Sequence, residues 1–291
     1  MVAKIHRRSF VAGAATLIAA PKSFAVSRPQ RVVTLEWTAA EISLSLGISP
    51  IGCAEISGYR TWVNISADRL AGATDLGRRQ QPSLEAIRRL QPDLILSSRY
   101  RHASIIKALG DIAPVHLLDD QASDGDMLAS VYQSTTQAGA ALSRSDGAAE
   151  LLARFDDDIE MLISRYSSAL SMQKLLVAQP LPGVPRLRVF APNAAICHLL
   201  RKIGFVDALD LSPQPFGFTT IDLEGLAAVD EDSALVILAE SVPDELLNSS
   251  LWPMLPVVVK GNVRLTNAPS WPFGSTASLK HLAGEIVSRF V

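Results

Sequence analysis

The sequence predicts an α/β protein of two related lobes joined by one long helix, on three observations. Strand-like and helix-like segments alternate along both halves of the chain. One amphipathic helical pattern of unusual length separates the halves. A short motif, Leu-Glu-x-apolar followed by an apolar strand, occurs once in each half. Alternation of this kind indicates a largely parallel sheet covered by helices, and the repeated motif favours two lobes of similar architecture.

The first lobe is predicted over residues 26–143. Its strand-like stretches are rich in β-branched and apolar residues, and its helical stretches bring apolar residues to one face. Gly47 and Gly77 lie at joins between elements, where a glycine tolerates a positive φ. The expected strands are 31–35, 51–54 and 93–97, and the expected helices are 38–46 and 83–90.

A connecting helix is predicted over residues 144–172. Apolar side chains from Leu151 to Leu170 fall on one stripe at helical spacing. At 1.5 Å per residue the pattern spans roughly 40 Å, comparable to the diameter of a small domain. A helix of this length is long enough to brace two lobes.

The second lobe is predicted over residues 173–291. Pro180, Pro182 and Pro185 separate its first two strand-like stretches, and the alternation of strands and helices resumes after them. Its last helix carries a capping signal. The expected strands are 175–178, 187–190, 234–239 and 257–263, and the expected helices are 194–203, 223–229 and 275–290.

The N-terminus has the three parts of an export signal. A basic start that includes Arg7 and Arg8 precedes an apolar run over 10–20 and an A-x-A-like cleavage site ending at Ala25. The arginine pair is typical of a twin-arginine signal, and the run is too short to cross a bilayer. We expect residues 1–25 to be removed, leaving a soluble periplasmic protein; a buried N-terminal helix is the alternative.

The composition excludes some functions and leaves one cysteine question open. The chain has 27 Lys and Arg against 29 Asp and Glu, which gives no basic footprint for nucleic acid. Cys53 and Cys197 permit one disulfide in an oxidising compartment. Each lies in an apolar stretch, which favours two small buried residues instead.

No catalytic or metal-binding motif is present in the sequence. It has no G-x-S-x-G elbow, no glycine-rich phosphate loop and no H-E-x-x-H. The histidines after the signal are dispersed, without the short spacing typical of metal ligands: His102, His116, His198 and His281. We therefore expect a binding protein without catalytic or metal-ligating residues, and an exported α/β hydrolase is the rival hypothesis.

Five segments carry a resemblance that covers nearly the whole mature chain: 31–37, 59–63, 76–85, 189–193 and 271–274. In their order and spacing they resemble the periplasmic siderophore-binding proteins of ABC importers, in the ferric hydroxamate (ferrichrome-type) branch. The resemblance implies two Rossmann-like lobes and one long helix, in a monomer that closes only slightly. It also implies an aromatic cleft for a ferric siderophore that alone holds the iron, and an inner-membrane ABC permease as partner. Haem, a corrinoid or a catecholate siderophore is the alternative ligand.

The resemblance also implies the site residues. Arg79 matches the arginine that donates hydrogen bonds to the iron-chelating oxygens, a role suited to a planar, permanently charged guanidinium. Aromatic side chains would pack the carbon skeleton of the ligand, and two further arginines are expected near them. These predicted ligand-binding residues are Trp62, Tyr100, Arg101, Arg188, Phe216, Trp271 and Phe273.

Three positions depart from the closest relatives of that branch. Phe216 stands where they have tryptophan, Phe273 where they have tyrosine, and Arg188 where they have an apolar residue. The additional arginine leads to the hypothesis of a ligand more anionic than ferrichrome, such as a carboxylate-bearing hydroxamate. Glu85 and Glu224 match the surface glutamates that pair with permease arginines, and ordinary exposed helix glutamates are the alternative.

Overall fold

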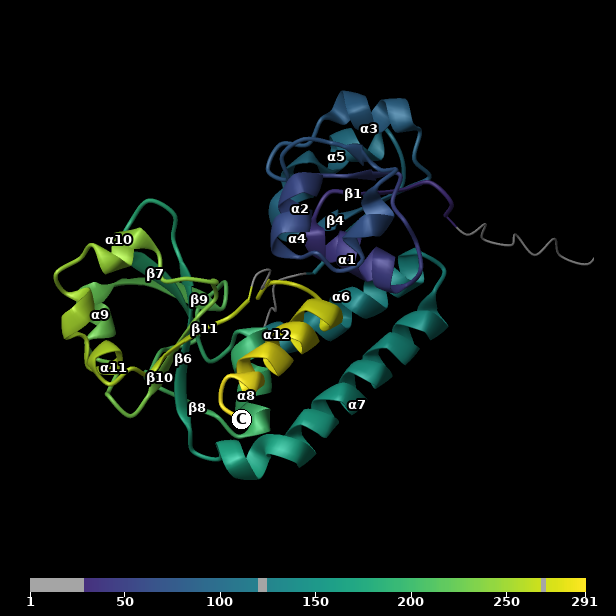
Figure 1. Ribbon diagram of the computed structural model, residues 1–291. Coiled ribbons are helices and arrows are strands. Elements are labelled where there is room, and N and C mark those ends of the chain that lie inside the picture. Colours follow the sequence, from purple (N-terminus) through teal and green to yellow (C-terminus); the bar gives the residue numbers. More distant parts are fainter. Residues whose placement is uncertain (1–28, 120–124, 268–270) are drawn as a thin grey trace, which may run out of the picture.

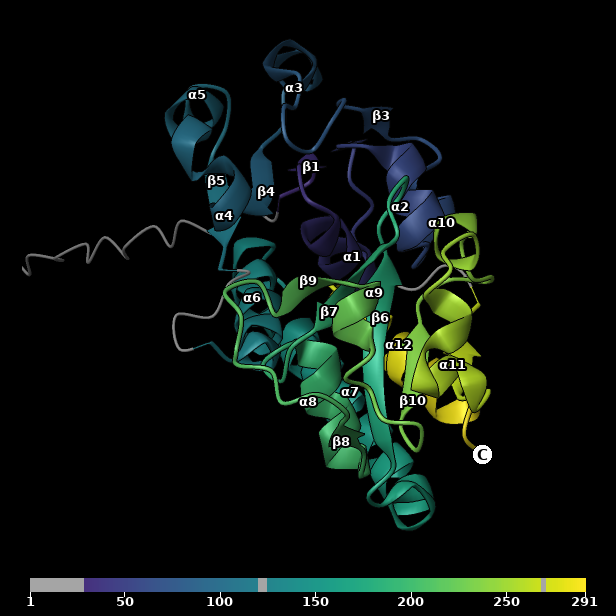
Figure 2. The ribbon, with the colours of Figure 1, turned by 90° about the vertical axis from the view of Figure 1, so that its left-hand side faces the viewer.

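A computed structural model describes residues 29–119, 125–267 and 271–291. Figure 1 shows two α/β lobes, with a long helix running beside both of them. Figure 2 shows the first lobe above the second after a quarter turn. The structure confirms the expected fold class of two α/β lobes and one long helix. The predicted signal, 1–25, lies outside the described residues.

The N-terminal lobe is built on parallel strands in the order β3-β2-β1-β4-β5 within the described part of the chain. β1 is central, with Val33 beside Gly52 on one neighbour and beside Ile95 on the other. Fully buried strands of this kind read as continuous apolar runs. The strands are β1 (Val32–Thr34), β2 (Gly52–Cys53), β3 (Thr74–Asp75), β4 (Leu94–Ser98) and β5 (Val115–Leu118).

The helices of this lobe agree with the predicted ones and add others. Gly47 and Gly77 have φ of 81° and 83°, as expected at these joins. Ser83 caps the helix after it by accepting a hydrogen bond from the Ala86 amide at 3.2 Å. The helices are α1 (Trp37–Ser45), α2 (Ile56–Trp62), α3 (Leu84–Leu90), α4 (Arg99–His102) and α5 (Ile106–Gly110), with 3₁₀ turns at Ala67–Leu70 and Ala103–Ile105.

The C-terminal lobe has a mixed sheet in the order β11-β10-β6-β7-β9, and β8 also pairs with β6. The proline-rich stretch is the turn of an antiparallel hairpin that pairs Ala178 with Val189. β7 and β9 are also antiparallel. The strands are β6 (Lys174–Pro180), β7 (Arg186–Phe190), β8 (Val206–Asp207), β9 (Phe218–Asp222), β10 (Ala234–Ile237) and β11 (Val263–Leu265).

One predicted strand of this lobe is wrong. Residues 257–263 were expected to be extended, but Pro256 starts a helical turn, and the strand begins only at Val263. Proline at the first helical position has a φ already suited to a helix, and this outweighs the β propensity of three valines. The helices are α8 (Ala195–Ile203), α9 (Leu223–Leu226), α10 (Asp244–Leu247), α11 (Pro256–Val259) and α12 (Thr276–Ser288), with a 3₁₀ turn at Trp252–Met254.

Two helices connect the strands of the first lobe to those of the second along the chain, α6 (Met127–Ala141) and α7 (Ser145–Leu170). The second matches the predicted long helix closely, whereas the first was not predicted. Leu128 and Val131 of α6 belong to the core of the C-terminal lobe. Ala138 of the same helix belongs to a core cluster of the N-terminal lobe. Helix α6 therefore joins the two cores, so the boundary proposed at residue 143 falls after an element shared by both lobes.

The two cysteines lie in separate lobes. Cys53 is on β2 and Cys197 is on α8, and both are buried and free. Burial raises the pKa of the Cys53 thiol to about 11. Both residues therefore act as small buried side chains, the interpretation that the sequence favoured.

The close approach of α6 and α7 gives the first prediction. A Cβ on Gly139 would lie 2.4 Å from the Cβ of Ala148, whereas a Cβ on Gly147 would meet only Leu46 at 3.7 Å. We expect Gly139→Ala to lower the free energy of unfolding by about 1–3 kcal/mol through overpacking. Gly147→Ala should instead raise it by up to about 1 kcal/mol through helix propensity. Urea unfolding checks both, and equal effects would contradict the close contact.

Candidate ligand-binding site

A cavity of about 460 Å³ lies between the two lobes. Its volume is in the range of small-molecule sites. Both lobes and the segment before α12 contribute side chains to it. The described lining residues are Glu36, Thr38, Arg79, Tyr100, Arg101, Met127, Ser130, Val131, Ser134, Arg188, Phe190, Ala194, Ala195, Phe216, Phe218, Trp271, Pro272, Phe273 and Gly274.

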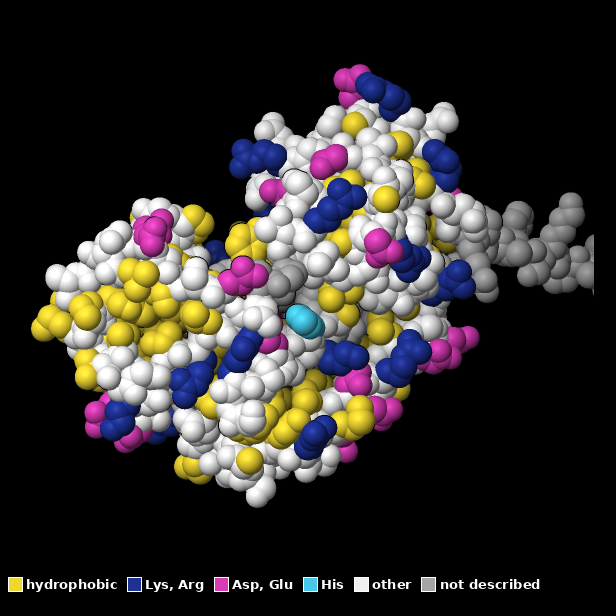
Figure 3. All heavy atoms as spheres, viewed as in Figure 1, with side chains coloured by type: hydrophobic (Ala, Val, Ile, Leu, Met, Phe, Trp, Pro, Cys, Tyr) yellow, Lys and Arg dark blue, Asp and Glu magenta, His cyan; other side chains and the backbone are white. Residues whose placement is uncertain are grey.

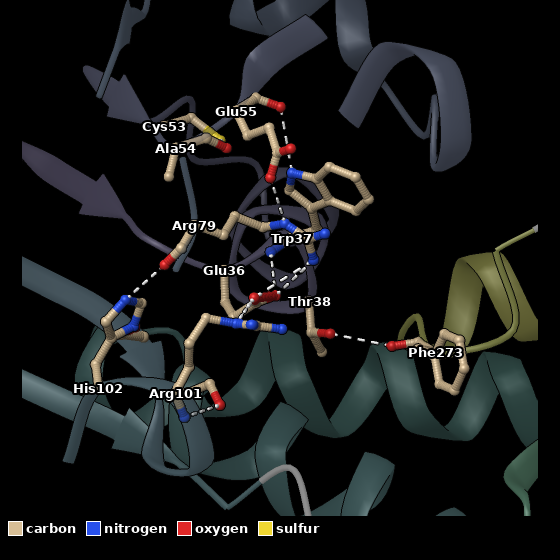
Figure 4. Close-up of polar contacts among 12 residues, drawn as sticks. Glu36, Trp37, Thr38, Cys53, Ala54, Glu55, Arg79, Arg101, His102 and Phe273 are labelled. Atoms are coloured by element: carbon tan, nitrogen blue, oxygen red, sulfur yellow. Dashed lines mark hydrogen bonds and ion pairs between the residues drawn. The ribbon is translucent and has the colours of Figure 1, made fainter. Parts of the chain in front are cut away.

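Arg79 is held in place on the N-terminal wall (Figure 4). Its Nε donates to Glu55 Oε2 at 2.9 Å, and its Nη1 donates to Glu36 Oε2 at 3.2 Å. The guanidinium carbon lies 3.4 Å from the ring centroid of Trp37. With a side chain only 11% exposed, Arg79 combines charge-assisted hydrogen bonds with stacking on an aromatic face.

Glu36 is shared between two arginines. Its Oε1 accepts a hydrogen bond from Nε of Arg101 at 2.5 Å, while its other oxygen pairs with Arg79. The Glu36 side chain is 9% exposed. Because β1 ends two residues earlier, the carboxylate lies at the carboxyl end of the parallel sheet, where ligands bind in many α/β proteins. One carboxylate thus orients two guanidinium groups and offsets part of their charge.

His102 fixes the backbone beside this cluster. Its Nε2 lies 2.8 Å from the Arg79 carbonyl, and its Nδ1 lies 2.5 Å from the Ser97 hydroxyl. Because a carbonyl only accepts, Nε2 carries the proton and Nδ1 accepts from serine. Burial lowers the pKa of His102, which favours this neutral form. The histidine positions the Arg79 main chain without adding charge to the cavity.

Aromatic rings form a continuous path from one lobe to the other. The path starts beside Arg79, passes through the segment before α12, crosses β9 and returns to α4 of the N-terminal lobe. Its rings meet mostly edge to face, an arrangement that ring quadrupoles favour. Successive centroid distances are Trp37–Trp271 4.9 Å, Trp271–Phe273 5.3 Å, Phe273–Phe218 5.5 Å, Phe218–Phe216 6.2 Å and Phe216–Tyr100 5.1 Å.

Arg188 on β7 forms the opposite wall. Its Nη1 donates to Gln179 Oε1 at 2.8 Å, and its guanidinium carbon lies 4.4 Å from the centroid of Phe218. Its Nε is buried without a hydrogen-bond partner, and no ion pair to Arg188 is found among the described residues. Burial lowers the pKa of this guanidinium. Unlike Arg79 and Arg101, Arg188 faces the cavity with an uncompensated charge.

Seven of the eight predicted ligand-binding residues meet at this cavity, and Trp62 is not among its described lining residues. Trp62 ends α2 and is 41% exposed, because that helix directs Tyr59 into the core. Sequence reasoning missed the role of Glu36 and Glu55. Each lies two residues after the end of a short strand of the parallel sheet, a signal that could have identified them.

Metal-ligating side chains do not gather at this site or elsewhere in the described residues. No group of three His, Cys, Asp or Glu side chains that could hold a metal ion occurs among them. The lining has instead three guanidinium groups, one carboxylate and a set of rings. This chemistry suits a partly anionic ligand with apolar surface.

The chain is similar to known proteins over most of its length. It is 29% identical over 258 residues to the iron(3+)-hydroxamate-binding protein FhuD of Escherichia coli, covering 87% of this chain and 84% of that protein. It is 27% identical to the Fe(3+)-citrate-binding protein YfmC of Bacillus subtilis, covering 84% and 75%.

A solved structure agrees with these relatives. The siderophore-binding protein FhuD of Vibrio cholerae, solved with Fe³⁺-Desferal bound, superimposes with a TM-score of 0.78 at 25% identity, covering 90% of this chain and 97% of that one. The family model described as periplasmic binding protein matches residues 32–269. This chain therefore belongs to the periplasmic binding protein family, a family of transport proteins and not of enzymes.

Proposed function

We propose that this protein captures a ferric hydroxamate siderophore in the interlobe cavity and delivers it to an inner-membrane ABC importer. The observation that carries the proposal is the fixed, stacked guanidinium of Arg79 in an aromatic cavity between two lobes. Relatives that bind iron(3+)-hydroxamate and Fe³⁺-Desferal support it. In this proposal the siderophore alone holds the iron, and the protein acts as a monomer.

The proposed place of action is the periplasm. The three-part N-terminal signal supports this location, and so does membership of the periplasmic binding protein family. In residues 29–119, 125–267 and 271–291, no helix has the length and apolar character needed to span a bilayer.

Arg79 gives a direct test of ligand recognition. A ferric hydroxamate presents negatively polarised oxygens around the iron, which a planar guanidinium can reach with two donors. We expect Arg79→Lys, which keeps the charge but loses the planar fork, to weaken binding about tenfold to a hundredfold. Quenching of tryptophan fluorescence by ferric siderophores measures the affinity, because Trp271 lines the cavity and Trp37 packs on it.

The matched control is Arg78→Lys, a change at the exposed neighbouring residue. It should leave the affinity unchanged. Equal affinities for Arg79→Lys and the unmodified protein would refute the role of Arg79. An absence of quenching with every hydroxamate would count against the ligand class itself.

The charge of the cavity refines the ligand. Arg79 and Arg101 share the carboxylate of Glu36, whereas Arg188 is without an ion-pair partner among the described residues. An uncompensated buried cation is costly, and a ligand carboxylate would relieve that cost. A relative that binds Fe(3+)-citrate, a carboxylate ligand, supports this direction. We propose that the preferred siderophore carries a free carboxylate that pairs with Arg188.

This refinement predicts a preference between ligands. The unmodified protein should bind an anionic ferric hydroxamate more tightly than a neutral one. Arg188→Leu should remove that preference by weakening binding of the anionic ligand about tenfold. It should also raise the free energy of unfolding, because a half-buried charge without an ion-pair partner is lost. Arg186→Leu, at an exposed position of the same strand, is the control. Equal titration curves for both ligands in the unmodified protein would contradict the proposed pairing of a ligand carboxylate with Arg188.

Two glutamates, one in each lobe, occupy equivalent positions that suit docking on a permease. Glu85 on α3 and Glu224 on α9 each follow the capping residue by two positions, in the first turn of a short helix. Both are exposed, Glu85 with 83% of its side chain. Figure 3 shows hydrophobic side chains gathered on the C-terminal lobe over the region of α9, α10 and α11. Two carboxylates, one on each lobe, are suited to setting the register of a docked partner.

Measuring both cellular uptake and siderophore affinity distinguishes a role in permease docking from a role in ligand binding. We expect Glu85→Ala with Glu224→Ala to leave siderophore affinity unchanged but to reduce uptake of radiolabelled ferric siderophore at least about tenfold in cells that depend on this carrier. Glu150→Ala with Glu160→Ala, two exposed glutamates of α7, is the control. Uptake at the unmodified rate by the first double variant would exclude the docking role.

A further inference from the structure

A buried carboxylate of the N-terminal lobe holds the C-terminal helix of the chain. Glu41 on α1 is fully buried. Its Oε2 accepts from the Ser275 amide at 3.0 Å and from the Ser278 hydroxyl at 2.7 Å, and its Oε1 accepts from the Ser278 amide at 2.9 Å. These donors lie at the start of α12, more than 230 residues away in sequence.

This carboxylate takes the place of a helix cap. The first amides of a helix have no partner within the helix and attract a negative charge. Ser275 is the N-cap residue of α12, yet its side chain makes no cap hydrogen bond. Its hydroxyl lies instead 3.2 Å from Thr135 Oγ1 on α6. The cap of α12 is therefore supplied by the other lobe, so α12 is fastened to α1 as well as to its own core.

The same face of α1 also holds the segment before α12. Thr38, one turn before Glu41, donates through Oγ1 to the Phe273 carbonyl at 3.1 Å. A Cβ on Gly274 would lie 2.6 Å from Glu41 Oε2 and 2.3 Å from the Ser278 Cβ, so only glycine permits this approach. The segment is thus fitted to α1 by the hydrogen bond of the Phe273 carbonyl, the close approach at Gly274 and the hydrogen bonds of residues 275–278 to Glu41.

The fastened segment carries part of the aromatic wall. Trp271 packs on Trp37 of the N-terminal lobe at 4.9 Å. Phe273 packs on Phe190 and Phe218 of the C-terminal lobe, at 5.5 Å each. The position of this segment against α1 therefore sets both the distance from the rings to Arg79 and the separation of the lobes.

We propose that Glu41 is a positioning residue that clamps the two lobes: by capping α12 from α1, it fixes the Trp271–Phe273 wall of the cavity relative to Arg79. Glu41 does not line the cavity among the described residues. Its effect on ligand binding is indirect, and its effect on affinity rests on the proposed function. The clamp itself exists without ligand and can be tested without one.

The experiment compares Glu41→Gln with Ser43→Ala. The glutamine keeps the size but replaces one acceptor by a donor that faces the Ser275 or Ser278 amide. Ser43 is equally buried on the same helix, and its hydroxyl donates to the Ala39 carbonyl within that helix at 2.8 Å. Nitroxides at Arg88→Cys and Lys202→Cys, exposed positions on α3 and α8, report the distance between lobes by pulsed electron paramagnetic resonance.

We expect a narrow distance distribution for the ligand-free unmodified protein and for Ser43→Ala, and a broad one for Glu41→Gln. Siderophore affinity should fall about tenfold in Glu41→Gln, the variant with the broad distance distribution. It should be unchanged in Ser43→Ala. If Glu41→Gln does not fold, Ser278→Ala, which removes only one of the hydrogen bonds, should give a smaller change in the same direction.

A narrow distribution in a folded Glu41→Gln protein would overturn the clamp. Destabilisation of Glu41→Gln with an unchanged ligand affinity would reduce Glu41 to a structural residue and overturn its positioning role. Failure of the unmodified protein to bind any ferric siderophore would instead contradict the proposed function, while the distance measurement would still test the clamp.

Discussion

The carboxylate of Glu36 is the interaction on which the candidate site depends. Two cationic side chains, Arg79 of a loop and Arg101 of α4, would repel each other at this short separation. Between them Glu36 accepts a hydrogen bond from each and makes their proximity favourable. Glu55 accepts a further hydrogen bond from Arg79, and His102 donates one to the main-chain carbonyl of Arg79. The guanidinium groups are therefore oriented before any ligand arrives, which lowers the entropic cost of binding.

The two walls of the cavity differ in charge compensation. The N-terminal wall has arginines paired with carboxylates. Within the described part of the chain, Arg188 on the C-terminal wall has instead an amide partner and aromatic neighbours. A paired arginine can orient a ligand without a strong preference for its charge. A half-buried arginine without an ion-pair partner favours an anion, because the anion replaces solvation that burial removed. In the proposed function, recognition of the chelated iron and discrimination by ligand charge therefore lie on opposite lobes.

The lobes are joined by more than the long helix. Helix α6 contributes to a core cluster of each lobe, and α12 of the C-terminal lobe is capped by Glu41 of the N-terminal lobe. Each connection replaces water with buried contacts across the boundary between lobes, where a freely hinged protein would have only a linker. Such connections favour a cavity whose walls keep their separation.

The sequence by itself determined the α/β alternation and the long helix, and it predicted seven of the nineteen described residues that line the cavity. Periodicity and turn residues are local, so α7 and the glycine joins could be predicted. The family motifs led to Arg79 and to four of the aromatic residues at the cavity, but not to Phe190 and Phe218. The tertiary structure alone decided what depends on distant partners. It turned Trp62 outward, made residues 256–259 helical, and brought Glu41 to α12. The partner of a buried charge lies hundreds of residues away, and no local pattern encodes that distance.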